Sequence, residues 1–279
     1  MKKNVSEPIQ AELTKQEPEV EVVAAEVKAP EFDVDIAQDI VFKPNPGPQT
    51  NFLSASEREV LYGGAAGGGK SFAMLADPLH GLNDPNFSGL LVRHTTEELR
   101  ELIQKSQELY PKAVPGIKWS ERKSQWIAPR GGRLWMSYLD KDMDVTRYQG
   151  QAFNWIGFDE LTQWPTPYAW DYMRSRLRSA FSSQLGLYMR ATTNPGGNGH
   201  QWVKKMFIDP SPAGQPFWAT NIETGDTIKF PKGHSREGQP LFKRRFIPAS
   251  LFDNPYLADS GDYEAMLLSL PEHQRKQLL

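Results

Sequence analysis

Cysteine is absent from the 279 residues of this sequence, and histidine occurs only five times. The lack of cysteine excludes disulfide bonds and thiolate metal sites, and it fits a reducing compartment. The histidines show no H-E-x-x-H spacing and no G-x-S-x-G sequence is present, so neither a zinc peptidase nor a serine hydrolase is indicated. The chemistry of this chain must come from other residue types.

Long apolar runs are lacking as well. No stretch approaches the roughly 20 apolar residues that span a bilayer, and the N-terminus has no apolar core of a signal peptide. We therefore expect a soluble protein of the cytoplasm with no membrane partner. The hydrophobic fraction of 39% is still sufficient for a substantial core.

The first 40 residues are poor in aromatics and unbalanced in charge. They contain ten Asp or Glu and four Lys, whereas the whole chain has 34 acidic and 32 basic residues. The charge is therefore −6 over residues 1–40 and +4 over residues 41–279, which keep 24 acidic and 28 basic side chains. Such a leader cannot bury enough apolar surface to fold. We predict a disordered acidic tail at 1–40 and one globular domain at 41–279.

Apolar runs that suit strands alternate with helix-compatible segments along the globular part. Strands are expected at 59–62, 89–93, 124–128, 133–139, 154–158, 185–191 and 242–249, and helices at 69–79, 96–110, 167–181 and 260–270. The pair at 124–128 and 133–139 is typical of a β-hairpin. The alternation predicts an α/β fold whose mostly parallel central sheet carries helices on both faces. In such sheets ligands bind where the strands end.

The segment from Gly64 to Ser71 fits the phosphate-binding loop pattern G-x-x-x-x-G-K-[ST]. Gly and Ala let the backbone curl so that N–H groups converge on phosphate oxygens, and the helix that follows adds its positive end. Lys70 is expected to reach the β- and γ-phosphates, and the Ser71 hydroxyl to ligate Mg²⁺. The predicted nucleotide-binding residues are Gly64, Ala65, Ala66, Gly67, Gly68, Gly69, Lys70 and Ser71. A glycine-rich surface loop is the alternative, which the apolar flanks disfavour.

An acidic pair follows about 90 residues later, where the apolar run 155–158 ends in Asp159 and Glu160. Adjacent strand residues point to opposite sides, so the two carboxylates can take separate roles. We expect Asp159 to support the Mg²⁺ shell, usually through water, and Glu160 to polarise the attacking water. The alternative is a strand followed by an acidic helix cap.

The next expected strand ends in Thr193 and Asn194. Taken alone, Thr-Asn-Pro-Gly is an ordinary turn. Placed beside the acidic pair, the two side chains could hydrogen-bond the γ-phosphate or the attacking water.

These elements, in this order, resemble the ATPase domain of the large terminase subunit of tailed bacteriophages, from about Gln49 to the end of the chain. Besides the phosphate loop and the acidic pair, the resemblance rests on segments 91–96, 98–99, 148–150, 175–178, 193–196 and 253–255. It implies a P-loop NTPase fold of the additional-strand, catalytic-glutamate type. It also implies an ATP- and Mg²⁺-dependent motor that threads double-stranded viral DNA through a portal into a procapsid. Its implied partners are the portal protein, the procapsid, the small terminase subunit and further copies in a ring, in the host cytoplasm.

The resemblance also assigns residues. Gln49 matches a family position that contacts adenine, and Thr193 and Asn194 match a motif that couples hydrolysis to movement. A motor of this kind needs an arginine finger, which is worth roughly 10³ to 10⁵ in rate. Some terminases carry it inside the phosphate loop, where this chain has Ala66. We therefore favour Arg147, acting on the nucleotide of a neighbouring subunit, over Arg174, Arg176 and Arg178.

Large terminases normally continue into a ribonuclease-H-like nuclease domain, and this chain stops where that domain would begin. We therefore expect no DNA cleavage, and Asp253, Asp259 and Asp262 are typical of turn and cap positions. Basic residues at 204–205 and 243–245 could touch DNA phosphates, since such contacts need only charge and reach.

Two other functions stay open. A helicase or another DNA-translocating ATPase would keep the same fold. An assembly module would bind nucleotide and barely turn it over, as a single subunit would if the finger comes from its neighbour.

Overall fold

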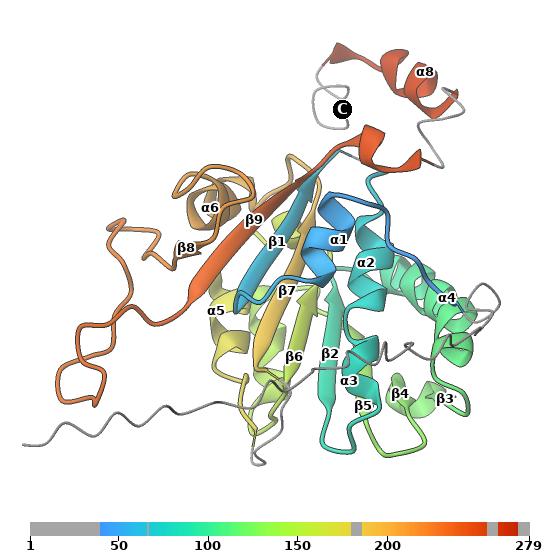
Figure 1. Ribbon diagram of the computed structural model, residues 1–279, viewed down its shortest axis with the longest axis horizontal. Coiled ribbons are helices and arrows are strands. Elements are labelled where there is room, and N and C mark those ends of the chain that lie inside the picture. The colour runs from blue at the N-terminus through green and yellow to red at the C-terminus, as the bar shows by residue number, and fades with distance from the viewer. Residues whose placement is uncertain (1–39, 66, 180–185, 256–261, 273–279) are drawn as a thin grey trace, which may run out of the picture. The chain divides into compact units, whose positions relative to one another are not determined.

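A nine-stranded sheet runs through the computed structural model, which describes residues 40–65, 67–179, 186–255 and 262–272 (Figure 1). Its strand order is β3-β4-β5-β2-β6-β7-β1-β9-β8. The strands are β1 (Glu59–Gly64), β2 (Ser88–Arg93), β3 (Lys118–Ser120), β4 (Gln125–Ile127), β5 (Arg133–Tyr138), β6 (Trp155–Phe158), β7 (Tyr188–Thr193), β8 (Phe217–Trp218) and β9 (Lys243–Ala249). The six strands that lie from β5 to β9 in this order pair in parallel, and β3, β4 and β8 add antiparallel edges. The predicted mostly parallel sheet is confirmed.

Helices cover both faces of the sheet, as predicted. The α-helices are α1 (Pro48–Leu53), α2 (Lys70–Ala76), α3 (Leu79–Leu82), α4 (Thr96–Ala113), α5 (Tyr168–Arg174), α6 (His200–Val203) and α8 (Asp262–Leu268). The other helical segments, which are not α-helical, are η2 (Glu121–Lys123), η3 (Asp142–Tyr148), η4 (Leu161–Gln163), η5 (Lys204–Ile208) and η6 (Leu251–Asp253). In Figure 1, α1, α2 and α4 lie over one face, and α5 and α6 lie behind the sheet. Within the described ranges, no helix combines the length and apolarity needed to cross a membrane.

Each face of the sheet has its own hydrophobic core. Along β1, Val60 and Tyr62 belong to the cluster under α2 and α4, whereas Leu61 belongs to the cluster under α5. Along β6, Trp155 packs into the first cluster and Ile156 into the second. Because successive strand residues point to opposite faces, a strand that is buried on both sides needs a continuous apolar run. This is why these strands were visible in the sequence.

The long helix α4 begins at a capping box. The Glu98 backbone N–H donates to the Thr95 hydroxyl, and the Thr95 backbone N–H donates to the Glu98 carboxylate, both at 3.3 Å. Each bond satisfies a backbone donor that the first helical turn leaves free. The helix buries its apolar side on the sheet and presents a polar flank, which matters for the site below.

Several element boundaries differ from the predictions. The helix predicted at 69–79 is two helices, because Pro78 cannot donate the next backbone hydrogen bond. The helix predicted at 167–181 ends at Arg174, and the strand predicted at 185–191 runs from Tyr188 to Thr193. The short elements α1, β3 and β8 were not predicted. Most of the predicted tail, residues 1–39, lies outside the described residues, as do Ala66, residues 180–185 and Asp259.

Near the start of β1, the fully buried Glu59 holds two arginines. Arg244 Nε lies 2.8 Å from one carboxylate oxygen of Glu59, and Arg174 Nε pairs with the other. Burial alone would raise the pKa of Glu59, but the two guanidinium groups outweigh it and lower that pKa. Arg244 is only 1% exposed, so the prediction that it could touch DNA is wrong. Its charge serves the fold.

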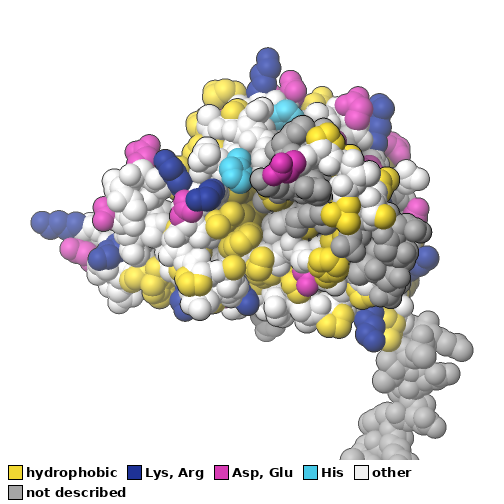
Figure 2. Space-filling view, turned by 90° about the horizontal axis from the view of Figure 1, so that it is seen from above, with side chains coloured by type: hydrophobic (Ala, Val, Ile, Leu, Met, Phe, Trp, Pro, Cys, Tyr) yellow, Lys and Arg dark blue, Asp and Glu magenta, His cyan; other side chains and the backbone are white. Residues whose placement is uncertain are grey.

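An arm at residues 219–242 connects β8 to β9 and extends from that edge of the sheet (Figure 1). Two isolated bridges, Thr220 with Thr227 and Lys229 with Pro240, join segments within the arm. Figure 2 shows both basic and acidic side chains on this arm, which contains Lys229, Lys232 and Arg236 together with Glu223, Asp226 and Glu237. The arm therefore carries charges of both signs.

Candidate nucleotide-binding site

The carboxyl ends of β1, β6 and β7 meet at one edge of the sheet. Strand β7 lies between β1 and β6, with which it pairs in parallel on either side. The phosphate loop after β1, the acidic pair after β6 and the Thr193–Asn194 pair at the end of β7 are therefore neighbours. This order, with one strand inserted between the loop strand and the acidic strand, is the predicted additional-strand arrangement.

Three side chains from outside the phosphate loop donate hydrogen bonds to its carbonyls. Asn254 Nδ2 donates to Gly67 O at 2.6 Å, and the Tyr62 hydroxyl donates to Gly68 O at 2.7 Å. Gln49 Nε2 donates to Gly69 O at 2.9 Å. In a trans peptide the carbonyl and the next N–H point in opposite directions. Because the scaffold engages three successive carbonyls, the N–H groups that follow them are turned away from it and are available to an anion.

Gly64 sets the close contact between the loop and β9. Its φ is +136°, and a Cβ atom there would lie 2.1 Å from Ala249 O. The Ala65 N–H donates to that same carbonyl at 3.0 Å. Any side chain at position 64 would push the loop off β9, so this position requires glycine.

Lys70 is buried at the start of α2. Its ammonium donates to Gly64 O at 3.2 Å and to Ala65 O. Burial lowers the pKa of Lys70, and the nearby carboxylates of Glu160 and Asp159 partly offset that effect. The lysine therefore lies inside the loop with its charge coupled to the acidic pair.

A pocket of about 300 Å³ opens between these elements. It is lined by Gly67, Gly68, Gly69, Lys70, Ser71, Phe72, Lys105, Glu160, Asn194 and Asn254. The phosphate loop, the second acidic residue and the end of β7, which are far apart in the sequence, thus border one space. Of the predicted loop residues, Ala66 is outside the described residues.

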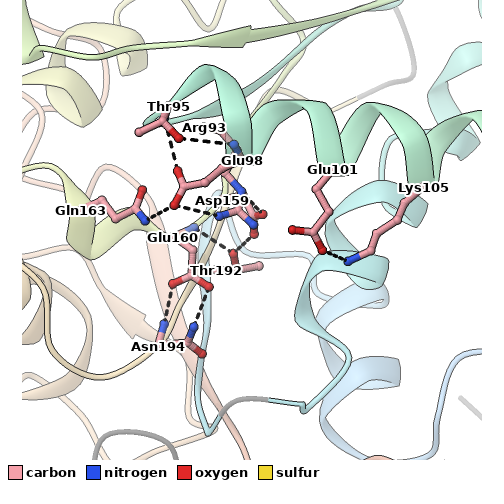
Figure 3. A network of polar contacts seen from close by, with 10 residues as sticks. All are labelled: Arg93, Thr95, Glu98, Glu101, Lys105, Asp159, Glu160, Gln163, Thr192 and Asn194. Carbon is pink, nitrogen blue, oxygen red and sulfur yellow. Dashed lines mark hydrogen bonds and ion pairs between the residues drawn. The ribbon is translucent and has the colours of Figure 1, made fainter. Parts of the chain in front are cut away.

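Glu160 is held by the neighbouring strand end. It has a left-handed backbone, with φ at +60°, which costs a non-glycine residue about 1–2 kcal/mol. The Asn194 backbone N–H donates to Glu160 Oε2 at 2.9 Å, Asn194 Nδ2 donates to Oε1 at 2.8 Å, and the Glu160 N–H donates to the Thr192 hydroxyl at 3.2 Å (Figure 3). Burial raises the pKa of Glu160, and the negative charge of Asp159 raises it further by a smaller amount. A fixed carboxylate of raised basicity suits a general base.

Asp159 is fully buried and does not line the pocket. Arg93 Nε lies 2.7 Å from its Oδ2, and the Thr192 hydroxyl donates to its Oδ1. With both oxygens engaged, Asp159 fits support of a cation through water better than direct ligation. Among the described residues no group of three or more His, Asp or Glu could hold a metal by itself. Ser71 also borders the pocket, and its side chain carries a hydroxyl oxygen of the kind that can ligate a hard cation.

Arg93 and Glu98 connect this centre to α4. Arg93 Nη1 lies 3.8 Å from Glu98 Oε1, which accepts a hydrogen bond from Gln163 Nε2 at 2.7 Å (Figure 3). No role was predicted for Arg93, Thr192 or Gln163. Arg93 could have been identified from the sequence, because it is a charged residue at the end of an apolar strand. A charge buried at such a position needs a partner of opposite charge.

Two predicted binding residues have structural partners. Gln49 is 4% exposed, and its Oε1 accepts from the Asn45 N–H at 2.6 Å while its Nε2 holds Gly69 O. The Thr193 hydroxyl lies 2.8 Å from that of Thr162, and Thr193 does not line the pocket. Of the predicted pair, Asn194 alone borders the pocket.

Arg147 lies on η3 and is not among the residues that line the pocket. Its side chain is 43% exposed, pairs with Asp144 and donates to the carbonyls of Asp144 and Tyr138. Arg174 is committed to Glu59, and Arg178 donates to the carbonyls of Gly150 and Gln151. None of the candidate arginines reaches the pocket of its own chain.

Comparison with known proteins gives consistent results. A family model described as the terminase large subunit, T4likevirus-type, N-terminal, matches residues 61–228. The large terminase ATPase domain of Thermus phage P74-26 aligns with a TM-score of 0.59 at 13% identity, over 86% of this chain and 94% of that chain. The large terminase of a second, thermophilic bacteriophage aligns with a TM-score of 0.58 at 12% identity, over 85% of this chain and 53% of that one. The chain thus spans about half the length of this second terminase.

The same thermophilic phage terminase in complex with ADP also matches, with a TM-score of 0.56 at 11% identity, over 83% of this chain and 52% of that one. No curated protein matches the sequence significantly. At these identities the structural matches establish the shared fold.

Proposed function

The chain belongs to the terminase large-subunit family, and from this premise we propose that it is the ATP-hydrolysing subunit of a motor that moves double-stranded viral DNA into a procapsid. The observation that carries the proposal is the pocket bordered by the phosphate loop, Lys70 and Glu160. Hydrolysis of a nucleoside triphosphate requires a phosphate-binding cradle and a residue that positions the attacking water, among other parts, and candidates for both border this one cavity.

In the proposed reaction, the loop N–H groups and Lys70 bind the phosphates of ATP. Ser71, with Asp159 acting through water, would hold Mg²⁺, which neutralises phosphate charge. Glu160 orients and polarises a water molecule for in-line attack on the γ-phosphate. Little covalent chemistry is required of the protein, because catalysis here is mostly positioning and charge stabilisation.

Two family roles extend the proposal. Gln49 keeps one amide hydrogen beyond the one that Gly69 O accepts, and we propose that this second hydrogen contacts adenine. Asn194 holds the catalytic carboxylate from the end of β7, so a shift of that strand end would move Glu160 as well. This contact is the physical basis on which we propose that residues 193–194 couple hydrolysis to movement.

Arg147 is the proposed arginine finger for a neighbouring subunit. Because it is exposed and does not line the pocket of its own chain, we propose that it acts between subunits of a homo-oligomeric ring. The same observation favours the second candidate function, a weakly active nucleotide-binding module, for a chain that is not assembled. Portal protein, procapsid, small terminase subunit and DNA are the proposed partners, in the host cytoplasm.

The test is ATP hydrolysis by the purified protein with procapsids bearing portals and double-stranded DNA, compared with forked DNA alone. We expect stimulation by procapsids and DNA together, and loss of all hydrolysis in Lys70→Ala. Stimulation by forked DNA with strand separation would instead identify a helicase. If no hydrolysis occurs at any protein concentration or with any partner, the weakly active nucleotide-binding module is the function that remains.

A further inference from the structure

A polar stripe on α4 faces the nucleotide pocket. Glu98, Glu101 and Lys105 follow one another at i, i+3 and i+7, so they share one side of the helix. In Figure 3 these three side chains extend from the same flank of α4. Glu98 contacts Arg93 and Gln163 in the acidic centre, and Lys105 reaches the pocket itself.

Lys105 is held only loosely in its observed position. Its ammonium lies 2.6 Å from Glu101 Oε1, and the two side chains are 33% and 61% exposed. A solvent-exposed pair at i and i+4 contributes little to stability, because water competes for both charges. The lysine can therefore exchange Glu101 for another anion without disturbing the helix, whose core contacts are made by other residues.

A second cationic side chain borders the pocket. Among the described residues that line it, Lys70 and Lys105 are the two cationic side chains. Lys70 is buried under the loop and bonded to the carbonyls of Gly64 and Ala65. A triphosphate brings more negative charge than one lysine neutralises, and phosphoryl transfer is stabilised by cations placed at the γ-phosphate.

We propose that Lys105 is a phosphate-binding residue that leaves Glu101 and donates to the γ-phosphate of ATP in its own subunit. The γ-phosphate is its target because Lys105 borders the same pocket as Glu160 and Asn194, which serve the reacting end of the nucleotide. After phosphate release Lys105 returns to Glu101. This inference rests on the proposed ATPase function. Lys105 would act on the nucleotide of its own subunit, in addition to Arg147, which is proposed to act from a neighbouring subunit.

The experiment compares Lys105→Ala, Lys105→Arg and the control Lys112→Ala. Lys112 is exposed and lies on the same stripe two turns further along α4, about 10 Å away from Lys105 along the axis. Equilibrium binding of ADP and of a non-hydrolysable ATP analogue is measured for each. Lys105→Ala should weaken analogue binding about 10- to 100-fold, the range for one hydrogen bond to a charged group, and leave ADP binding unchanged.

Lys105→Arg should restore most of the analogue affinity, and Lys112→Ala should match the wild type for both ligands. Unchanged analogue binding in Lys105→Ala, or equal losses for ADP and analogue, overturns the inference. Lys70→Ala separates the two proposals. If wild type binds both nucleotides, Lys70→Ala binds neither and Lys105→Ala is normal, the Lys105 role fails and the ATPase proposal stands. If the wild type binds no nucleotide, both fail.

Discussion

Asn194 donates a hydrogen bond to each oxygen of the Glu160 carboxylate, from its backbone nitrogen to Oε2 at 2.9 Å and from Nδ2 to Oε1 at 2.8 Å. The two residues belong to the ends of adjacent strands, β7 and β6. These two hydrogen bonds hold Glu160, whose backbone conformation is left-handed, at the border of the pocket. The orientation of the proposed base thus depends on the neighbouring strand.

Asn194→Ala removes one of these two hydrogen bonds and leaves the backbone bond. We expect turnover to fall about 10- to 100-fold, because a hydrogen bond to a charged group is worth about 1.5–3 kcal/mol. Nucleotide affinity should change little, since Asn194 acts on the base. Steady-state hydrolysis and equilibrium binding check this, with the exposed Asn198→Ala as control. Equal losses of turnover and affinity would contradict the positioning role.

Glu160→Gln should stabilise the fold at neutral and alkaline pH. Burial and Asp159 raise the pKa of Glu160, so the folded state binds its proton more tightly than the unfolded state does. The free energy of unfolding therefore falls as the pH rises from the unfolded-state pKa of Glu160 through its raised folded-state pKa. Above both pKa values, the ionised Glu160 carboxylate destabilises the fold. Thermal melting should give a higher Tm for Glu160→Gln at pH 8 and no difference near pH 4.

The control for this pH series is Glu108→Gln, on the exposed side of α4. It should leave Tm unchanged across the series. A Glu160→Gln variant that is less stable than wild type at pH 8 would show that the carboxylate stabilises the fold, contrary to this account.

The phosphate loop and the acidic pair were predictable because each is defined by a short, contiguous sequence motif. The partners of these patterns were not, because they depend on which strands become neighbours. Tyr62 and Asn254 both hold loop carbonyls, yet they lie 192 positions apart in the sequence. Arg93 and Thr192 meet at Asp159 only because β2 and β7 flank β6.

Arg244, within the basic run at 243–245, was misread for the same reason. Local sequence favours a solvated, DNA-facing surface there, since charged residues are mostly exposed. Burial of Arg244 requires a partner, and that partner is Glu59, 185 residues away. The strand itself, β9, was predicted at 242–249 and runs from Lys243 to Ala249.

Tyr62→Phe and Gln49→Ala together separate support of the loop from recognition of the base. Each removes one hydrogen bond to a loop carbonyl, so each should weaken ATP and GTP binding by about 3- to 10-fold. Gln49→Ala should in addition lose any preference for ATP over GTP, because of the proposed adenine contact. Competition binding with both nucleotides measures this. An unchanged base preference in Gln49→Ala would remove its adenine role and leave its support of the loop.

Arg147→Ala tests the finger between subunits. In the assembled state, turnover should fall about 10³-fold or more, with nucleotide binding unchanged. The sharper test mixes inactive Arg147→Ala with inactive Glu160→Gln. Subunits of the first supply the base and those of the second supply the arginine, so the mixture should recover activity. Arg176→Ala, whose side chain stacks on Tyr172, is the matched control. A mixture that stays inactive would argue against action in trans.

The most direct test of the central claim is the turnover of ATP by Glu160→Gln, measured beside its nucleotide affinity at the same pH. If Glu160 polarises the attacking water, affinity should stay within a few-fold of wild type while turnover falls by about 10² to 10⁴, the range for a general base. Wild-type turnover in Glu160→Gln would contradict the assignment of this pocket as the site of hydrolysis.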